Sequence, residues 1–151
     1  MLPTDENTED NNDQEVRTLI ERGLAYYSLG QYEQDIQDYG EAIRLDPYGA
    51  RAYFLRGLTY GYLGQDEQAI QDYGEAIRLD PQDAKAYYSR GRAYGELGQY
   101  EWAIQDYDEV IRLNPQNADA YYNRGVAYRE LGKLVEAERD IRKAKELGYA
   151  P

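Results

Sequence analysis

Residues 84–117 read AKAYYSRGRAYGELGQYEWAIQDYDEVIRLNPQN, and this stretch decides the fold. Apolar and small side chains recur every three or four positions on both sides of Gly98, which is the spacing of one face of an α-helix. A glycine suits the left-handed conformation that often ends a helix, and Pro115 disfavours helix in the residue before it. The stretch therefore predicts two helices of roughly 14 residues each, joined by a tight turn.

The same pattern occurs four times along the chain. Proline recurs every 34 residues, at Pro47, Pro81 and Pro115, and the turn glycine recurs with the same step. The repeating units span residues 16–49, 50–83, 84–117 and 118–151. One antiparallel helix pair cannot bury its apolar face alone, so stacked units must supply the core. We therefore expect an all-α protein with eight helices in four helix-turn-helix repeats.

Charge separates the N-terminal segment from the repeats and limits the partners. Residues 1–15 contain six acidic and no basic side chains, which predicts an acidic, disordered tail. The whole chain has a formal net charge of −12, which opposes binding to nucleic acid or to anionic membranes. The sequence contains no signal peptide and no apolar run of membrane length, so we expect a soluble, cytoplasmic protein.

The absence of cysteine and histidine excludes several kinds of chemistry. Thiol and imidazole catalysis, disulfides and zinc sites built on these side chains all require one or both residues. An enzyme would depend on carboxylates such as Asp106 and Asp108, which we expect on a solvent-facing helix without a metal-binding pattern. We therefore expect no enzymatic activity, no cofactor and no metal.

The aromatic, glycine, alanine and proline positions of the units identify a family resemblance. In the second unit they are Tyr53, Gly57, Tyr60, Ala69, Tyr73 and Pro81, and in the third Tyr87, Gly91, Tyr94, Ala103, Tyr107 and Pro115. This pattern resembles the tetratricopeptide repeat over 136 of the 151 residues. The resemblance implies a right-handed superhelix whose first helices line a concave groove that binds a peptide or helix of a partner protein.

Two charged residues recur in every unit. An arginine replaces the family's usual leucine at Arg22, Arg56, Arg90 and Arg124, and an aspartate recurs at Asp38, Asp72, Asp106 and Asp140. The arginines could form a ladder for an acidic ligand, or each could pair with the aspartate of its own unit. We favour the second interpretation, because a feature of all four units serves what all four share, the fold.

The fourth unit departs from the other three in its second helix. Glu138 and Lys145 stand where the first three units have isoleucine, while Ala137 and Ala144 stay small. The last helix is thus expected to be polar on its outer face, which caps a solenoid.

Two single residues also break the pattern. Asp35 takes a position that the other units give to alanine, so it is either paired or a sign of a looser first unit. Trp102, the only tryptophan, is either a partner contact on the convex side or, as we favour, a partly exposed surface aromatic.

First-helix positions between the core residues differ from unit to unit, and we expect specificity there. These inner positions include Ser89 and Glu96, and the expected binding set is Ile20, Leu24, Tyr27, Phe54, Leu55, Leu58, Tyr62, Lys85, Tyr88, Arg92, Tyr122, Asn123 and Arg129. Aromatic and arginine side chains dominate binding energy at many interfaces, so the expected hot spots are Phe54, Tyr88, Arg92 and Tyr122.

The expected groove is apolar and aromatic in its first half and polar with basic groups in its second. This pattern favours a ligand with an apolar anchor beside an acidic or amide-rich portion. Some family members clamp acidic chaperone tails with lysine, asparagine and arginine. The matching positions here are Ile20, Leu24, Leu55, Lys85 and Ser89, of which only Lys85 fits, so we do not expect this ligand.

The sequence leaves two functions from different classes. The first is a scaffold or adaptor that binds a protein segment in the groove. The alternative is a self-associating structural module. In either case we expect a monomer or a weak homodimer.

Overall fold

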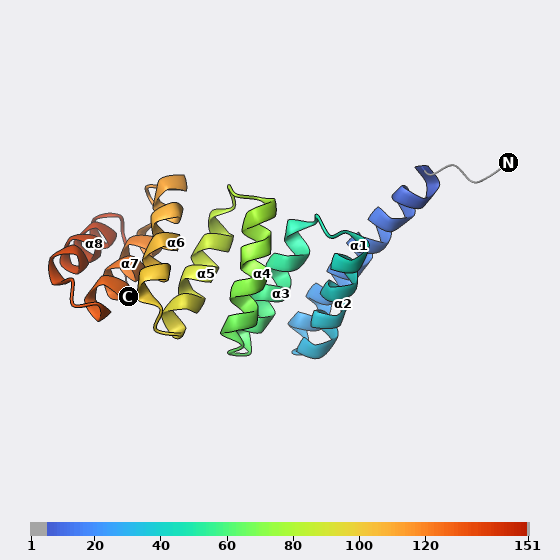
Figure 1. Ribbon diagram of the computed structural model, residues 1–151, viewed down its shortest axis with the longest axis horizontal. Helices are drawn as coiled ribbons and strands as arrows, with labels where there is room; N and C mark the ends of the chain where they lie inside the picture. The colour runs from blue at the N-terminus through green and yellow to red at the C-terminus, as the bar shows by residue number, and fades with distance from the viewer. Residues whose placement is uncertain (1–5, 151) are drawn as a thin grey trace.

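The computed structural model describes residues 6–150, and within this range the chain forms eight α-helices and no strand (Figure 1). The first helices of the units are α1 (Glu6–Ser28), α3 (Ala50–Tyr62), α5 (Ala84–Glu96) and α7 (Ala118–Glu130). The second helices are α2 (Tyr32–Leu45), α4 (Asp66–Leu79), α6 (Tyr100–Leu113) and α8 (Leu134–Glu146). Each helix packs on the next along the chain, and α5 also touches α3 and α7. The predicted all-α solenoid of four helix pairs is confirmed.

Each unit turns at the glycine that the sequence singled out. Gly98 has φ +70°, in the left-handed region where a side chain is strained, and Gly30, Gly64 and Gly132 have nearly the same value. One residue later, the backbone N–H of Gln99 donates to the carbonyl of Tyr94 at 2.8 Å, which satisfies an otherwise free helix-end acceptor. The turn is therefore a helix cap with a fixed geometry.

The first helix is longer than the sequence predicted. The expected disordered tail covered residues 1–15, whereas α1 begins at Glu6, and residues 1–5 lie outside the described part. A helix anchored by packing extends cheaply, because each added residue completes another hydrogen bond. Acidic side chains near a helix N-terminus are also favourable. This part of α1 projects beyond α2 in Figure 1, and residues 10–15 are exposed.

Small residues and tyrosines bring the two helices of a unit together. Tyr39 and Tyr73, from α2 and α4, are only 1% and 3% exposed. A Cβ placed on Gly57 would lie 2.8 Å from the ring of Tyr73, closer than real side chains approach. The absence of a side chain at this glycine of the first helix thus leaves room for the tyrosine ring of the second helix.

The recurring arginine and aspartate pair within each unit. Arg90 donates from Nε and Nη2 to the two carboxylate oxygens of Asp106 at 2.8 and 2.7 Å. The other three units repeat this bidentate contact at 2.6–2.9 Å. Hydrogen bonding to Asp106 raises the pKa of Arg90, and the rings of Tyr87 and Tyr94 lie 5.9 and 5.8 Å from its guanidinium carbon. The structural interpretation of the ladder is confirmed.

One arginine of the ladder also reaches the preceding unit. Nη1 of Arg124 donates to Asp108 at 2.7 Å. The residues equivalent to Asp108 are Gly40 and Gly74, and a Cβ on Gly74 would lie 3.7 Å from Nη1 of Arg90. Asp106 was expected on a solvent-facing surface, but it is buried, because its carboxylate pairs with Arg90.

Surface positions agree with the expected exposure. Glu138 and Lys145 of α8 are exposed while Ala137 and Ala144 are buried, so the polar outer face of the last helix is confirmed. Trp102 is 55% exposed and stacks on Tyr94, with ring centroids 6.2 Å apart. No helix between residues 6 and 150 is both long and apolar enough to cross a bilayer.

Candidate functional site

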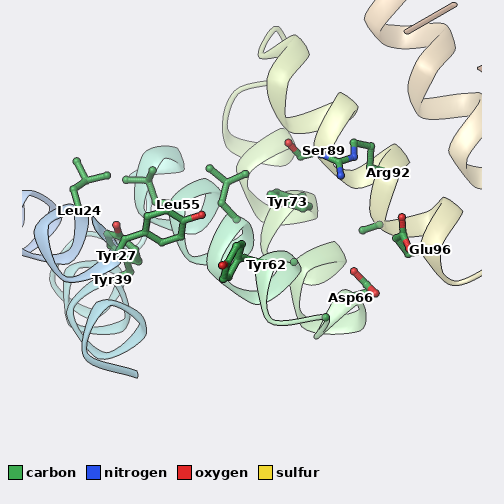
Figure 2. A pocket seen from close by; sticks show the side chains of 14 residues that line it. Leu24, Tyr27, Tyr39, Leu55, Tyr62, Asp66, Tyr73, Ser89, Arg92 and Glu96 are labelled. Atoms are coloured by element: carbon green, nitrogen blue, oxygen red, sulfur yellow. The ribbon is translucent and has the colours of Figure 1, made fainter. Parts of the chain in front are cut away.

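A pocket of about 470 Å³ runs along the first three units (Figure 2). We call it the inter-unit pocket. Its walls come mainly from α1, α3 and α5, with contributions from α2, α4 and the turn between α3 and α4. The lining residues are Leu24, Tyr27, Tyr39, Leu55, Leu58, Gly61, Tyr62, Gly64, Asp66, Tyr73, Ser89, Arg92, Ala93 and Glu96.

The floor of the inter-unit pocket is apolar. Tyr39 and Tyr73 rise from the second helices between Leu24, Leu55 and Leu58 of the first helices. Burial raises the pKa of Tyr39 and of Tyr73 to about 12, so both phenols stay neutral at physiological pH. The three leucines therefore favour an apolar or aromatic ligand group on this floor.

Tyr27 and Tyr62 form one wall of the pocket, and both rings pack against Tyr32, which does not line it. The rings of Tyr27, Tyr32 and Tyr62 have centroids 5.5, 6.1 and 4.9 Å apart, close enough for favourable aromatic contact. The Tyr62 hydroxyl, and to a lesser degree burial, raises the pKa of Tyr32 to about 12. Tyr62 is 64% exposed, so this wall offers a ring to a ligand.

The far end of the pocket is charged. Asp66 begins α4 and Glu96 ends α5, and Figure 2 shows the two side chains projecting toward the same space. Burial, followed by the charges of Glu96 and Glu67, raises the pKa of Asp66. Arg92 and Ser89 of α5 also line the pocket.

A second pocket of about 230 Å³ repeats this site one unit further along. Most of its lining residues lie 34 positions after a residue of the inter-unit pocket. Arg92, Gly95, Glu96, Tyr100, Tyr107, Asn123, Ala127 and Glu130 correspond to Leu58, Gly61, Tyr62, Asp66, Tyr73, Ser89, Ala93 and Glu96. The repeated backbone thus forms equivalent pockets at successive unit boundaries, and the side chains at each boundary determine the volume and polarity of the pocket.

The structure brings part of the expected binding set together. The inter-unit pocket contains Leu24, Tyr27, Leu55, Leu58, Tyr62 and Arg92, and the second pocket contains Arg92 and Asn123. Lys85 and Arg129 are exposed and line neither pocket. Ile20 is 8% exposed and packs in the core with Leu19, Ala42 and Ala52.

Three of the expected hot spots are engaged inside the protein. Phe54 packs against Tyr73, and Tyr88 against Tyr107, with ring centroids 5.9 Å apart in both pairs. Tyr88 also accepts a hydrogen bond from the Asn123 amide at 2.8 Å. Tyr122 stacks on Tyr149 at 4.1 Å. These rings therefore support the walls, and Arg92 is the hot-spot candidate that lines a pocket.

The pocket residues that sequence reasoning missed include Tyr39, Tyr73 and Asp66. The two tyrosines hold the repeated aromatic position of the second helix, which correctly indicated core packing and gave no sign that these buried rings also border a pocket. Asp66 had a usable signal, because the equivalent positions of the first and third units are Tyr32 and Tyr100. A charge in a position that the other units fill with tyrosine or leucine marks an altered site.

Comparisons with known proteins extend over most of the chain. The family model described as TPR repeat matches residues 23–64, 60–98 and 91–132, and the model described as Tetratricopeptide repeat matches residues 118–147. No curated protein sequence matches the chain significantly.

Several solved structures are similar to this chain. A crystal structure of MamA has a TM-score of 0.85 and 31% identity over 93% of this chain and 81% of that chain. The first TPR domain of Spaghetti (RPAP3), bound to the HSP90 peptide SRMEEVD, has a TM-score of 0.76 and 30% identity over 79% and 94%. MamA from Desulfovibrio magneticus RS-1 has a TM-score of 0.85 at 22% identity over 89% and 76%, which shows the shared fold alone.

Proposed function

Because this chain belongs to the tetratricopeptide repeat family, we propose that it is a scaffold that binds a peptide or helix of a partner protein in the inter-unit pocket. The observation that carries the proposal is an open pocket with an apolar floor, built by the first helices of three successive units. A segment crossing these units would contact side chains that differ at each step, as specific peptide recognition requires.

The structural neighbours and the carboxylates support a binding role. The RPAP3 domain has a similar fold and holds a short peptide, so an array of this size is large enough for such a ligand. The carboxylates considered for catalysis are engaged elsewhere, since Asp106 pairs with Arg90 and Asp108 with Arg124. We therefore propose a binding protein without catalytic activity.

The ligand differs from an acidic chaperone tail in this proposal. Among the five positions matched to the chaperone clamp, Ile20 is buried in the core, and Leu24 and Leu55 form the apolar floor of the pocket. These side chains cannot donate hydrogen bonds to carboxylates.

Site-specific crosslinking tests the proposal. A photoreactive benzoylphenylalanine replaces Tyr62 in the pocket or, as a control, Tyr48, which is 79% exposed and lies outside it. In native cell extract we expect one set of partner proteins to crosslink through position 62 and not through position 48. Addition of Leu58→Gln should abolish the crosslink. Equal crosslinking from both positions, or indifference to Leu58→Gln, would count against the pocket.

Self-association is the alternative and stays a prediction. Sedimentation velocity at increasing protein concentration separates a monomer or weak homodimer from a stable assembly. A stable oligomer that buries Tyr62 would favour the structural module. For the scaffold we propose a cytoplasmic location.

A further inference from the structure

The charged end of the inter-unit pocket has a negative pair that the protein does not neutralise. Among the side chains that the structure describes, no ion pair joins Asp66 or Glu96 to a cation. Arg92 is the basic residue that lines the pocket, and it forms no ion pair with either carboxylate among the described side chains. A ligand that enters this end therefore meets two free carboxylates.

Asp66 and Glu96 face the same end of the pocket at one boundary between units. Asp66 and Glu96 occupy the positions that Tyr32 and Tyr62 occupy one unit earlier. That tyrosine pair is in direct contact, with ring centroids 4.9 Å apart. Asp66 and Glu96 both line this end of the pocket, and the negative charge of Glu96 helps to raise the pKa of Asp66. A cation between them removes this repulsion.

A third acidic side chain, Asp35, is buried near the pocket residue Tyr39 but does not itself line the pocket. Asp35 is 0% exposed, and neither of its carboxylate oxygens has a hydrogen-bond partner. Its charge contributes to the raised pKa of Tyr32 and of Tyr39, so it lies close to the aromatic side of the same pocket. Asp35 is independent of the acidic pair, and it biases the pocket toward the same sign of ligand charge.

We propose that the inter-unit pocket binds a lysine or arginine side chain of the partner segment, with the charged group between Asp66 and Glu96. The inference rests on the proposed scaffold function and specifies its ligand. The aliphatic part of such a side chain fits along Leu58, and its charge lies near the exposed ring of Tyr62. An apolar neighbour in the same segment occupies the floor at Leu24 and Leu55.

This ligand chemistry reverses the expectation from sequence. The basic residues of the later units suggested an acidic or amide-rich ligand portion, but Lys85 and Arg129 line neither pocket, and the single cation Arg92 is outnumbered by Asp66 and Glu96 in the inter-unit pocket. The net charge of −12 also attracts a basic segment over long range and accelerates its association at low salt. The pocket and the molecule as a whole therefore favour the same ligand charge.

Three matched peptides test the ligand charge. They share one leucine-containing half, and the other half carries lysines, glutamines or glutamates. Binding is measured by calorimetry and by shifts of the amide resonances of Gly61 and Gly64, which line the pocket. We expect the lysine peptide to bind roughly tenfold more tightly than the glutamine peptide, as one charge-assisted contact provides. The glutamate peptide should bind most weakly.

Variants identify the carboxylates responsible. Asp66→Asn and Glu96→Gln should each reduce the preference for lysine, while Arg92→Gln should maintain or increase it. Glu33→Gln is the matched control, because Glu33 is exposed on α2 and lies outside the pocket. Circular dichroism verifies that each variant is folded.

Two results overturn the inference and leave the scaffold in place. One is tightest binding of the glutamate peptide with loss of affinity in Arg92→Gln. The other is equal binding of all three peptides with shifts at Gly61 and Gly64. The scaffold proposal fails separately, when no partner crosslinks through position 62.

Discussion

Asp35 and Thr59 form an unusual buried contact between the first two units. Both are 0% exposed. The equivalent pairs at the later unit boundaries are Ala69 with Ala93 and Ala103 with Ala127. The nearby Thr59 hydroxyl acts to lower the pKa of Asp35 but offsets burial only in part, and neither carboxylate oxygen has a partner within hydrogen-bond distance. A polar pair thus replaces a small apolar one, at a cost in stability.

We predict that Asp35→Ala stabilises the protein at neutral pH. Burial is the main reason that the pKa of Asp35 rises from 3.8 to about 6. The folded state therefore binds the Asp35 proton more tightly than the unfolded state. Its contribution to stability is full below the unfolded pKa and is lost as pH rises through about 6. Removing the carboxyl should raise the free energy of unfolding by about 1–3 kcal/mol at pH 8.

Urea unfolding at about pH 4 and pH 8 checks this prediction. Asp35→Ala should gain more at pH 8 than at pH 4, and Asp35→Asn, which keeps the shape, should lose the same pH dependence. Equal pH dependence in wild type and both variants would contradict the assignment to Asp35.

A second residue-scale prediction concerns Gly74. Nη1 of Arg90 lies 3.7 Å from the position of a Cβ at this residue, and the equivalent residue one unit later is Asp108, which accepts from Arg124. Gly74→Asp should add the same ion pair and remove a helix glycine, for a gain of about 0.5–1 kcal/mol. Thermal unfolding measures the gain. Gly74→Ala separates the helix effect from the ion pair, and an equal gain in both variants would argue against the pair.

At the scale of the helix pair, the arginine and aspartate join the two helices of each unit. We predict that Arg90→Leu destabilises the protein by about 3 kcal/mol, because Asp106 is 4% exposed and would remain buried without its partner. Arg90→Leu with Asp106→Ala should recover part of this loss. A double-mutant cycle in urea gives the coupling, and additive losses would indicate that the two side chains act independently.

Much of this helical arrangement could be predicted from sequence, and the site could be predicted only in part. The step of 34 residues located every turn glycine, and the matched arginine and aspartate gave the ion pairs in advance. Helical spacing also selected Leu58 and Tyr62. It could not separate Phe54 and Tyr88, which pack on Tyr73 and Tyr107, from rings that face the pocket, because that depends on how a unit packs in three dimensions. The extension of α1 to Glu6 carried no apolar pattern at all.

For the whole molecule, each unit gains its stability from adjacent units. Each helix packs chiefly on its neighbours along the chain, so α1 and α8 have fewer supporting elements than the central helices. We predict that amide hydrogen exchange is slowest in α4 and α5 and fastest in the exposed start of α1 and in α8. Mass spectrometry of peptic fragments measures the gradient. Uniform protection that is lost in one step would show that the array unfolds as a single unit.

The same two backbone positions recur at each unit boundary. They are occupied by Tyr32 and Tyr62 at the first boundary, Asp66 and Glu96 at the second, and Tyr100 and Glu130 at the third. Because the surrounding helices have the same arrangement at each boundary, exchanging these two side chains changes the ligand preference of the boundary and leaves the fold unchanged. Replacing Asp66 and Glu96 with tyrosine should leave the fold unchanged and alter which ligands bind at the second boundary. Each unit boundary of the solenoid can therefore differ in ligand preference while the backbone stays the same.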